Sequence, residues 1–440
     1  MKELIRSNNK GIYKRNQIIT IVSCLIGCVI GLYPLWKLKF LLIIIGGILS
    51  IIFIIVLQVR YNYIVGLNII LLAISIIEPS PSDIVFILIL LFGLINGELE
   101  IKRLREGVFP LGLVACFLFT NLLGMFNMIE PYHGMKYFII TLYLLVFAFF
   151  FFIYMKEERL IYTFRAYVIS TVLSALLGFI GYLGYFSNIL MYDEHRVQGL
   201  FKDPNVFGPF LIPGVLILIE DIKARKIFGN HLFLYFSTLG LIILGVIFSF
   251  SRGAWVNLVV SLFIYYLLNF KKYPIKKIII LLLIIILCGY FVWFYILSDE
   301  LKGFFLGRSS LQGYDVDRFT AQRVGLSLAS ENIFGYGPGQ YEWAVVKKMG
   351  MEFSAHNLYI RLVLENGIIG FLSFLILFLY IILRLFQLRL EGESKASLLI
   401  SILVGIMVNS LVIDTIHWRH LWFFTGLSLS IVNKTKKHLV

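Results

Sequence analysis

The stretch YFIITLYLLVFAFFFFIYM at residues 137–155 decides the class of fold. It contains no charged side chain, and the charged run KEER follows it directly at residues 156–159. An α-helix needs about 20 mainly apolar residues to cross the hydrocarbon core of a bilayer. The stretch therefore predicts a transmembrane helix that ends at a charged membrane interface.

The rest of the chain has the same character. Of its 440 residues, 60% are hydrophobic and only 15% are charged, and the mean hydropathy is +0.90. Soluble domains carry about 25% charged residues, and disordered chains are poor in apolar and aromatic residues. The composition excludes both classes and predicts an all-α polytopic membrane protein.

The same length criterion, applied outward from residues 137–155, predicts about fourteen transmembrane helices. They are expected at 18–36, 40–58, 63–77, 84–97, 108–127, 137–155, 164–186, 206–219, 232–250, 254–270, 277–297, 357–383, 396–413 and 417–432.

One long segment, residues 298–356, interrupts this pattern. Loops of this length are uncommon and usually functional. We expect an amphipathic helix at 317–330 and a short helix at 340–348, separated by the glycine-rich run GYGPG at 335–339. The chain then divides into N-terminal transmembrane helices, 1–190, and a region 191–440 that holds this lid-like loop.

The positive charge predicts the orientation of the chain. Lysine and arginine total 39 against 25 acidic residues, which gives a net charge of +14. In a membrane protein, the distribution of this positive charge indicates which side of the membrane each loop faces. We therefore predict no nucleic-acid partner. The segments expected inside carry 25 of the basic residues, and the short outer connections carry 7. Because short cytoplasmic loops are enriched in lysine and arginine, both termini are predicted to be cytoplasmic and the 298–356 loop extracytoplasmic.

Two polar clusters at predicted outer helix ends contain an arginine. RVQGLFKDPN at 196–205 has the composition of a turn that leads into a helix, in which Arg196 could bind an anion. A plain re-entry turn is the alternative. In SRGAW at 251–255, Ser251 can cap a helix that begins near Arg252. Helix N-termini bind anions through their free N–H groups, and an interfacial arginine that only reaches toward water is the alternative.

The other two clusters lie in and after the long loop. Arg318 and Arg323 form either part of an anion site or a solvated helix face. His356 stands at the start of a predicted span, where the helix end favours a neutral imidazole that can accept a proton. Arg361 and Glu365 follow at the spacing of a helical ion pair. Ionisable residues at membrane depth indicate function, whereas a capping histidine with a structural ion pair is the alternative.

Two groups of acidic and histidine residues could be interpreted as metal ligands: Asp315 with Asp317, and Asp414 with His417 and His420. The second group is spaced by uniform steps of three, which drift around a helix, and Arg419 within it would oppose a cation. No phosphate-binding GxxxxGK[ST] loop is present in the sequence. We therefore predict neither a metal nor a cofactor.

Arginines and a neutral histidine at the outer side suggest one chemistry. Guanidinium groups match phosphate oxygens bidentately, and an activated donor outside the cell must be carried by a lipid. A polyprenyl diphosphate sugar fits, with an acceptor hydroxyl attacking the anomeric carbon and expelling the diphosphate. His356 would act as the general base, and Arg196 and Arg252 would stabilise the leaving group.

These motifs resemble the O-antigen ligase and Wzy-type polysaccharide polymerase family of bacteria. The resemblance covers about the last 250 residues and rests on RVQGLFKDPN (196–205), SFSRGAW (249–255), NIFGYGPGQY (332–341) and AHNLYIRLVLENGIIG (355–370). It implies a C-type glycosyltransferase fold in the bacterial cytoplasmic membrane. It also implies metal-independent, inverting transfer from an undecaprenyl diphosphate-linked glycan.

The resemblance also assigns roles. It implies that His356 is the catalytic residue and that the diphosphate is bound by Arg196, Arg252 and, with less support, Arg318. The supporting residues would be Asn205, Asn357, Arg361 and Glu365. The expected partners are the lipid-linked oligosaccharide donor, a glycan acceptor and the lipid bilayer, and a chain-length regulator is a candidate partner.

Three activities stay open at this point. The chain could polymerise the repeat units of a capsule, exopolysaccharide or O-antigen, or act as a ligase that moves the glycan to lipid A core, a wall polymer or a protein. Richness in isoleucine, lysine and asparagine is typical of an AT-rich genome and favours a Gram-positive organism without lipid A, and hence polymerisation. A flippase for the same lipid-linked glycan is the alternative from another class, although it leaves a catalytic-type histidine unexplained.

Overall fold

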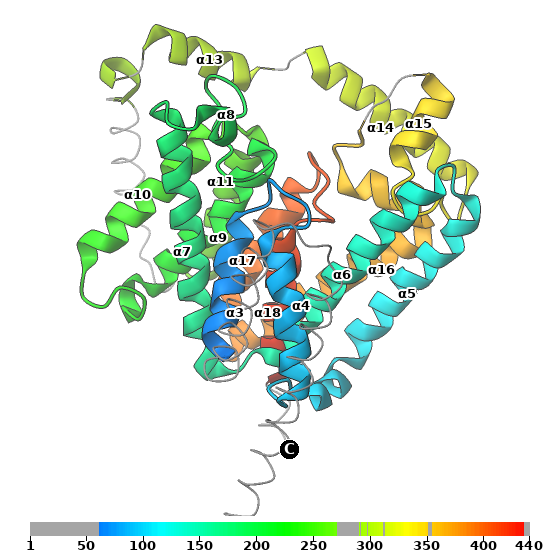
Figure 1. Ribbon diagram of the computed structural model, residues 1–440, viewed down its shortest axis with the longest axis horizontal. Coiled ribbons are helices and arrows are strands. Elements are labelled where there is room, and N and C mark those ends of the chain that lie inside the picture. The colour runs from blue at the N-terminus through cyan, green and yellow to red at the C-terminus, as the bar shows by residue number, and fades with distance from the viewer. Residues whose placement is uncertain are drawn as a thin grey trace, which may run out of the picture.

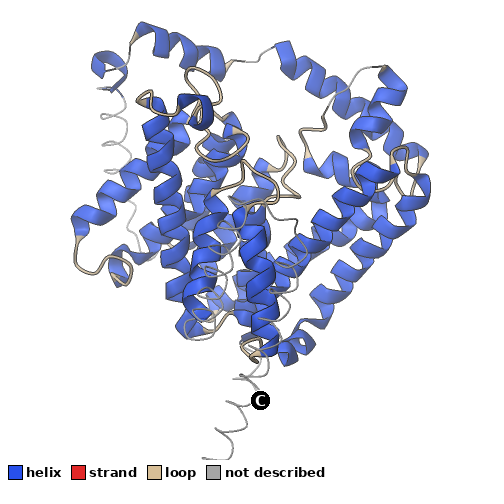
Figure 2. Ribbon diagram, in the orientation of Figure 1, coloured by secondary structure: helices blue, strands red, loops and turns tan. Residues whose placement is uncertain are grey.

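The computed structural model describes residues 61–270, 290, 292–296, 298–310, 313–350 and 354–434. All of the regular elements in these ranges are helical, and no strand occurs among them (Figure 2). The predicted spans 18–36 and 40–58, most of 277–297, and both ends of the chain lie outside the described residues.

A helix lies at each predicted span that falls within the described ranges, and all of these helices except α18 (Arg419–Lys434), at the predicted span 417–432, are apolar enough to count as candidate spans or shorter apolar helices. Five helical segments are long and apolar enough to cross a membrane, and five shorter apolar helices accompany them. The α-helices are α3 (Tyr61–Ile70), α4 (Pro81–Ile95), α5 (Val108–Gly124), α6 (Pro131–Tyr154), α7 (Glu157–Tyr182), α8 (Ser187–Leu190), α9 (Pro204–Ala224), α10 (Leu232–Phe248), α11 (Arg252–Leu268), α13 (Asp299–Ser309), α14 (Gly313–Glu331), α15 (Tyr341–Met349), α16 (Leu358–Leu390), α17 (Ser394–Asn409) and α18 (Arg419–Lys434). The chain is therefore a multi-pass membrane protein, and the total of about fourteen spans stays a prediction.

Helix α9 forms the centre of the bundle. It packs against α7, α10, α11 and α17 (Figure 1). Asp203 caps its N-terminus by accepting a hydrogen bond from the Asn205 amide at 2.8 Å, and Pro204 occupies the first helical position. The helix has 21 residues, so the predicted span of 206–219 was too short. At about 1.5 Å per residue, α9 is about 30 Å long, which matches the hydrocarbon core of a bilayer.

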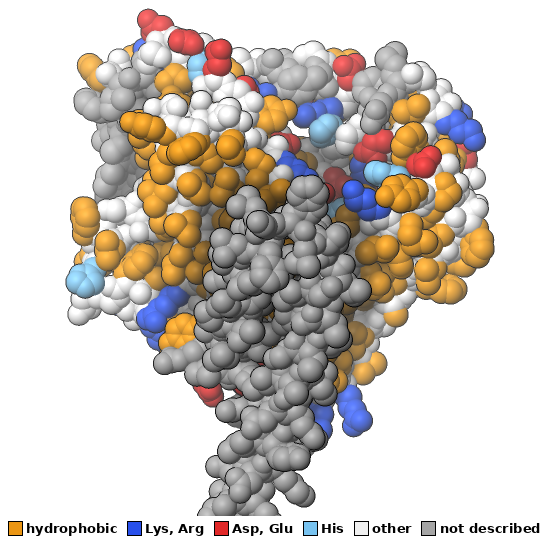
Figure 3. Space-filling view, viewed as in Figure 1, with side chains coloured by type: hydrophobic (Ala, Val, Ile, Leu, Met, Phe, Trp, Pro, Cys, Tyr) orange, Lys and Arg blue, Asp and Glu red, His pale blue; other side chains and the backbone are white. Residues whose placement is uncertain are grey.

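The surface of the bundle agrees with a membrane environment. In the space-filling view, apolar side chains form a broad zone across the middle of the molecule, and most of the visible charged side chains lie above or below it (Figure 3). Large apolar side chains on α5, α11 and α16 are exposed, among them Phe119, Val259 and Leu379. Exposed apolar area of this extent is unfavourable in water and favourable in lipid.

The described part of the segment between α11 and α16 includes α13, α14 and α15, of which α13 and α14 extend across one end of the bundle (Figure 1). The Phe305 ring on α13 stacks on Trp255 at a centroid distance of 4.8 Å. On the other side, α14 packs against α16, and the Tyr341 hydroxyl donates to the Ala321 carbonyl at 2.8 Å. The amphipathic helix and the short helix expected in this loop are present as α14 and α15.

The predicted span 357–383 corresponds to α16, but the helix breaks at Gly367, where φ is 65° and ψ is 180°. The break frees backbone carbonyls for the glycine-rich run that precedes α15. The Tyr336 amide donates to the Leu364 carbonyl at 2.9 Å, and the Gly337 amide donates to the Glu365 carbonyl at 2.9 Å. Two of the sequence motifs thus bind each other through their backbones.

Replacing Gly367 with alanine is expected to destabilise the protein by about 2–4 kcal/mol, because an added Cβ would overlap the Ile333 carbonyl and the positive φ disfavours any L side chain. The effect would appear as a lower midpoint of thermal unfolding in detergent. Gly240→Ala in α10 is the matched control, since open space surrounds that position. Equal midpoints for the two variants would show that the break at Gly367 is not needed for the fold.

Candidate functional site

A cavity of about 750 Å³ lies where the N-terminal ends of α9 and α11 meet the C-terminal end of α17, with α14 along one side. Five of the residues selected from the sequence line it, namely Arg196, Asn205, Arg252, Arg318 and His356. Basic and histidine side chains are visible around a hollow beneath the uppermost helices (Figure 3). Residues from four separate sequence motifs thus share one cavity.

Arg196 is buried and is held in place by three neighbouring residues. Its Nε donates to the Ser249 carbonyl at 3.3 Å, and one terminal nitrogen donates to the Asn205 side-chain oxygen at 3.4 Å. The guanidinium also lies over the Tyr192 ring, 5.2 Å from its centroid. Burial, followed by the nearby Arg308, lowers the pKa of Arg196 from its ordinary value. Asn205 therefore lies against Arg196, and its supporting role stays a prediction.

Arg252 forms the strongest ion pair in the cavity wall. Its Nη2 donates to both carboxylate oxygens of Asp315, at 2.7 and 2.9 Å, and its Nη1 donates to the Ser310 carbonyl at 3.1 Å. Arg318 approaches the same carboxylate at 3.7 Å. As predicted, Ser251 caps α11, accepting from the Ala254 amide at 3.3 Å. Asp315 is therefore paired with guanidinium groups, which argues against its use as a metal ligand.

One cavity arginine was not selected from the sequence. Arg308, in the last turn of α13, donates through Nε and Nη2 to the Phe250 carbonyl at 3.3 and 3.2 Å. No motif surrounds it, and only the docking of α13 beside α11 brings it to the cavity. Arg323, which the sequence offered together with Arg318, is exposed and does not line the cavity.

His356 lies at the edge of the cavity in an uncommon backbone conformation, with φ of 41°. Residues other than glycine adopt this left-handed region at an energetic cost, which is tolerated mostly at functional positions. Asn357 caps α16 instead of His356, accepting from the Ile360 amide at 3.1 Å and donating to the Leu411 carbonyl at 3.0 Å. Burial, followed by the positive charge of Arg318, lowers the pKa of His356 to about 4. The lowered pKa favours the neutral imidazole expected from the sequence, and its main cause is burial rather than the helix end.

Arg361 and Glu365 do not line the cavity. Their predicted ion pair is present at 2.8 Å, and Arg361 also pairs with Glu342 and, at 2.9 Å, with Asp414. The Glu365 carboxylate accepts hydrogen bonds from the Gly339 amide at 2.9 Å and the Tyr341 amide at 3.0 Å. The two residues anchor the glycine-rich run next to α16, so their support of the site is indirect.

Asp414 and His417 both contact Tyr137, but the three residues Asp414, His417 and His420 do not form a metal-ligand group. Asp414 and His417 precede α18, so the helical spacing considered from the sequence was wrong for them. His417 lies 3.0 Å from the Thr141 hydroxyl, and His420 is buried beside Trp418. Among the described residues, the one group with metal-ligand geometry is Glu194, His195 and Glu300, none of which lines the cavity.

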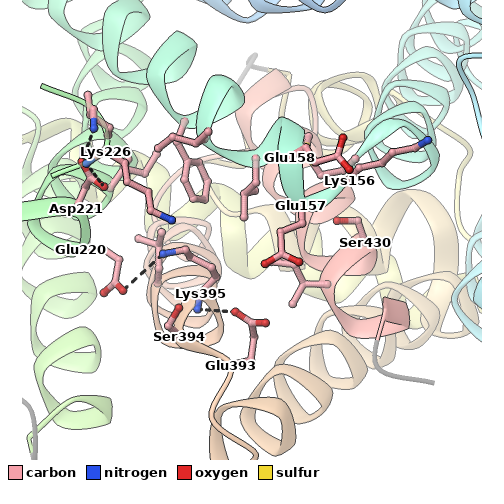
Figure 4. A pocket seen from close by; sticks show the side chains of 18 of the residues that line it. Lys156, Glu157, Glu158, Glu220, Asp221, Lys226, Glu393, Ser394, Lys395 and Ser430 are labelled. Atoms are coloured by element: carbon pink, nitrogen blue, oxygen red, sulfur yellow. Dashed lines mark hydrogen bonds and ion pairs between the residues drawn. The ribbon is translucent and has the colours of Figure 1, made fainter. Parts of the chain in front are cut away.

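A second cavity, of about 560 Å³, lies at the opposite ends of α9 and α17 (Figure 4). Four segments that the charge pattern places inside contribute to its lining, through Glu100, Lys156, Glu220 and Lys395 among others. Glu220 and Lys395 come within 3.9 Å of each other there. The structure thus gathers the segments predicted to be cytoplasmic around one cavity, away from the arginines and His356.

Apolar helices that can cross a membrane, together with a cavity of arginine and histidine side chains at one of their ends, define a class: multi-pass membrane proteins with a cationic cavity. Residues 237–375 match the family model described as O-antigen ligase, which confirms the family resemblance for this part of the chain. The matched region contains Arg252, Arg318 and His356, and Arg196 precedes it. No curated protein sequence matches the chain. The family match indicates a membrane enzyme that processes lipid-linked glycans.

Proposed function

We propose that the chain is a metal-independent, inverting glycosyltransferase that uses an undecaprenyl diphosphate-linked glycan as its donor. It would polymerise repeat units of a capsule, exopolysaccharide or O-antigen at the outer face of the bacterial cytoplasmic membrane, with both termini inside. The observation that carries the proposal is the common cavity of four arginines and one neutral histidine.

The cavity suits both halves of a lipid diphosphate. Its guanidinium groups can bind the diphosphate oxygens, because arginine matches phosphate geometry with two parallel hydrogen bonds. Val256, Leu411 and Val412 line the same cavity, and each is 51% exposed. An apolar wall next to a cationic one allows a polyprenyl chain to stay in lipid while its headgroup reaches the arginines.

The reaction follows from this placement. The His356 imidazole accepts the proton of an acceptor hydroxyl, whose oxygen forms a bond to the anomeric carbon of the donor. The bond from that carbon to the diphosphate oxygen breaks, and its electron pair leaves with the diphosphate. Arg196, Arg252 and Arg318 stabilise the charge that develops there, and Arg308 adds a fourth guanidinium. Attack opposite to the leaving group inverts the anomeric configuration.

The acceptor separates a polymerase from a ligase. Polymerisation uses a second lipid-linked repeat unit, whereas a ligase transfers to lipid A core, a wall polymer or a protein. The richness in isoleucine, lysine and asparagine is typical of an AT-rich genome and favours a Gram-positive organism. Because a Gram-positive cell has no lipid A core, this composition supports polymerisation. The cavity residues themselves are compatible with either acceptor.

The test is reconstitution of the full chain with lipid-linked repeat units and a chelator. We expect polymer to form, with activity constant from alkaline pH down to 6.5, where an unshifted histidine would already be half protonated, and falling as the pH approaches about 4. The sign follows from the lowered pKa, since the base remains neutral until that pH. Loss of activity in chelator, with recovery on adding a divalent ion, would refute the metal-independent mechanism. Transfer only to a non-lipid acceptor would show a ligase.

A further inference from the structure

An acidic side chain is bound at the proposed donor site. Asp315, in the first turn of α14, accepts both of its short hydrogen bonds from Nη2 of Arg252, and its side chain is only 8% exposed. Arg318, one turn further along α14, lies 3.7 Å from the same carboxylate. The carboxylate therefore interacts with two of the cationic groups that we assign to the diphosphate.

The second acid in the cavity lining has a different task. Asp203 caps α9 through its 2.8 Å hydrogen bond with the Asn205 amide, and removing it would disturb the start of the central helix. Asp315 instead holds together α11 and α14, two elements that are far apart in the sequence. Asp315 can therefore leave Arg252 without removing the N-terminal cap of α9, whereas Asp203 is that cap.

A carboxylate and a phosphate compete for the same guanidinium positions. Both present two oxygens at a spacing that the guanidinium fork matches. Because Nη2 of Arg252 donates to both carboxylate oxygens of Asp315, a diphosphate that chelates the two terminal nitrogens has to displace Asp315 from at least one of these N–H groups. The like charge of the carboxylate also opposes a phosphate placed beside it.

We propose that Asp315 is an internal anion that the donor diphosphate displaces from Arg252, and that it thereby sets the affinity of the site for diphosphates. The proposal rests on the proposed function. Since α14 also carries Arg318 and Gln322, whose amide donates to the Ala355 carbonyl at 3.2 Å next to His356, the exchange releases the end of the helix that borders the catalytic position. Return of Asp315 to Arg252 favours release of the diphosphate product.

The experiment measures binding of a short-chain prenyl diphosphate to the purified full-length chain in detergent. Asp315→Asn keeps the size of the side chain and removes its charge, so we expect binding to become roughly tenfold tighter, the order of one charge-assisted interaction. Asp315→Glu keeps the competing charge and should remain near the original affinity. Asp317→Asn, at an exposed position two residues further along α14, is the matched control and should change nothing.

Unchanged or weaker binding of the prenyl diphosphate by Asp315→Asn would overturn the exchange. If Asp315 only positioned Arg252, removing its charge would lower the affinity instead of raising it. Misfolding of Asp315→Asn would weaken its binding of the prenyl diphosphate. Tighter binding by this variant therefore cannot result from damage to the fold. Arg252→Ala separates this result from the proposed function. If Arg252→Ala loses binding while Asp315→Asn does not gain it, the exchange alone fails; if Arg252→Ala binds as well as the original chain, the donor site itself is wrongly placed.

Discussion

Cells that produce the His356→Ala chain are expected to accumulate single repeat units on the lipid carrier at the outer face of the membrane and to make no long polymer. A general base contributes roughly 10²- to 10⁴-fold to a rate, and alanine cannot accept the proton of the acceptor hydroxyl. In vitro, polymer formation should fall by this factor while binding of the lipid diphosphate changes little. The measurement is the length distribution of the glycan, together with the sidedness of the lipid-linked units.

His356→Asn is the matched variant, because asparagine tolerates the left-handed backbone found at this position, where φ is 41°. It should fold at least as well as His356→Ala and be equally inactive. Full activity in either variant would remove the catalytic assignment. Accumulation of lipid-linked units at the inner face instead would indicate a flippase, since a transport defect traps the substrate on the side where it is made.

The second large effect is expected at Arg252. Arg252→Ala should lower turnover roughly 10²- to 10³-fold, the cost of losing one group that stabilises developing charge, and should also weaken donor binding. Arg252→Lys should not restore either, because lysine is a point charge and cannot match two phosphate oxygens with a bidentate fork as a guanidinium group does. Steady-state kinetics with a defined lipid-linked donor would measure both effects.

Arg323→Ala provides the control for Arg252. It removes one arginine from α14, the helix along one side of the cavity, but the side chain is exposed and lies outside the cavity lining. Its activity should equal that of the original chain. If lysine replaces Arg252 without loss, or if Arg323→Ala is as damaging as Arg252→Ala, then general positive charge near the membrane surface accounts for the arginines better than a specific diphosphate site.

Several features of the site were predictable because their signals are local. Ser251 was expected to cap a helix at Arg252, and the spacing of Arg361 and Glu365 predicted their ion pair; both are present. A helix cap involves residues three apart, and an ion pair of this kind involves residues four apart, so short-range spacing is sufficient to predict them.

Other features depend on contacts between distant segments. The low pKa of His356 was expected from a helix end, but it arises mainly from burial and from Arg318. Arg308 reaches the cavity only because α13 docks beside α11. The Asp315 carboxylate accepts hydrogen bonds from Arg252 only because α14 extends across the bundle. No spacing in the sequence encodes these distances.

The sequence by itself determined that the chain crosses a membrane as apolar helices, that its arginines and histidine gather at predicted outer helix ends, and which family it resembles. These properties follow from hydropathy, charge and short motifs, which are summed along the chain. Only the tertiary structure decided that α16 breaks at Gly367, that Arg361 and Glu365 lie outside the cavity, and that Asp315 binds Arg252. The reason is physical: these features result from packing between segments that are distant in the sequence. Arg252 and Asp315, for example, are 63 residues apart in the chain.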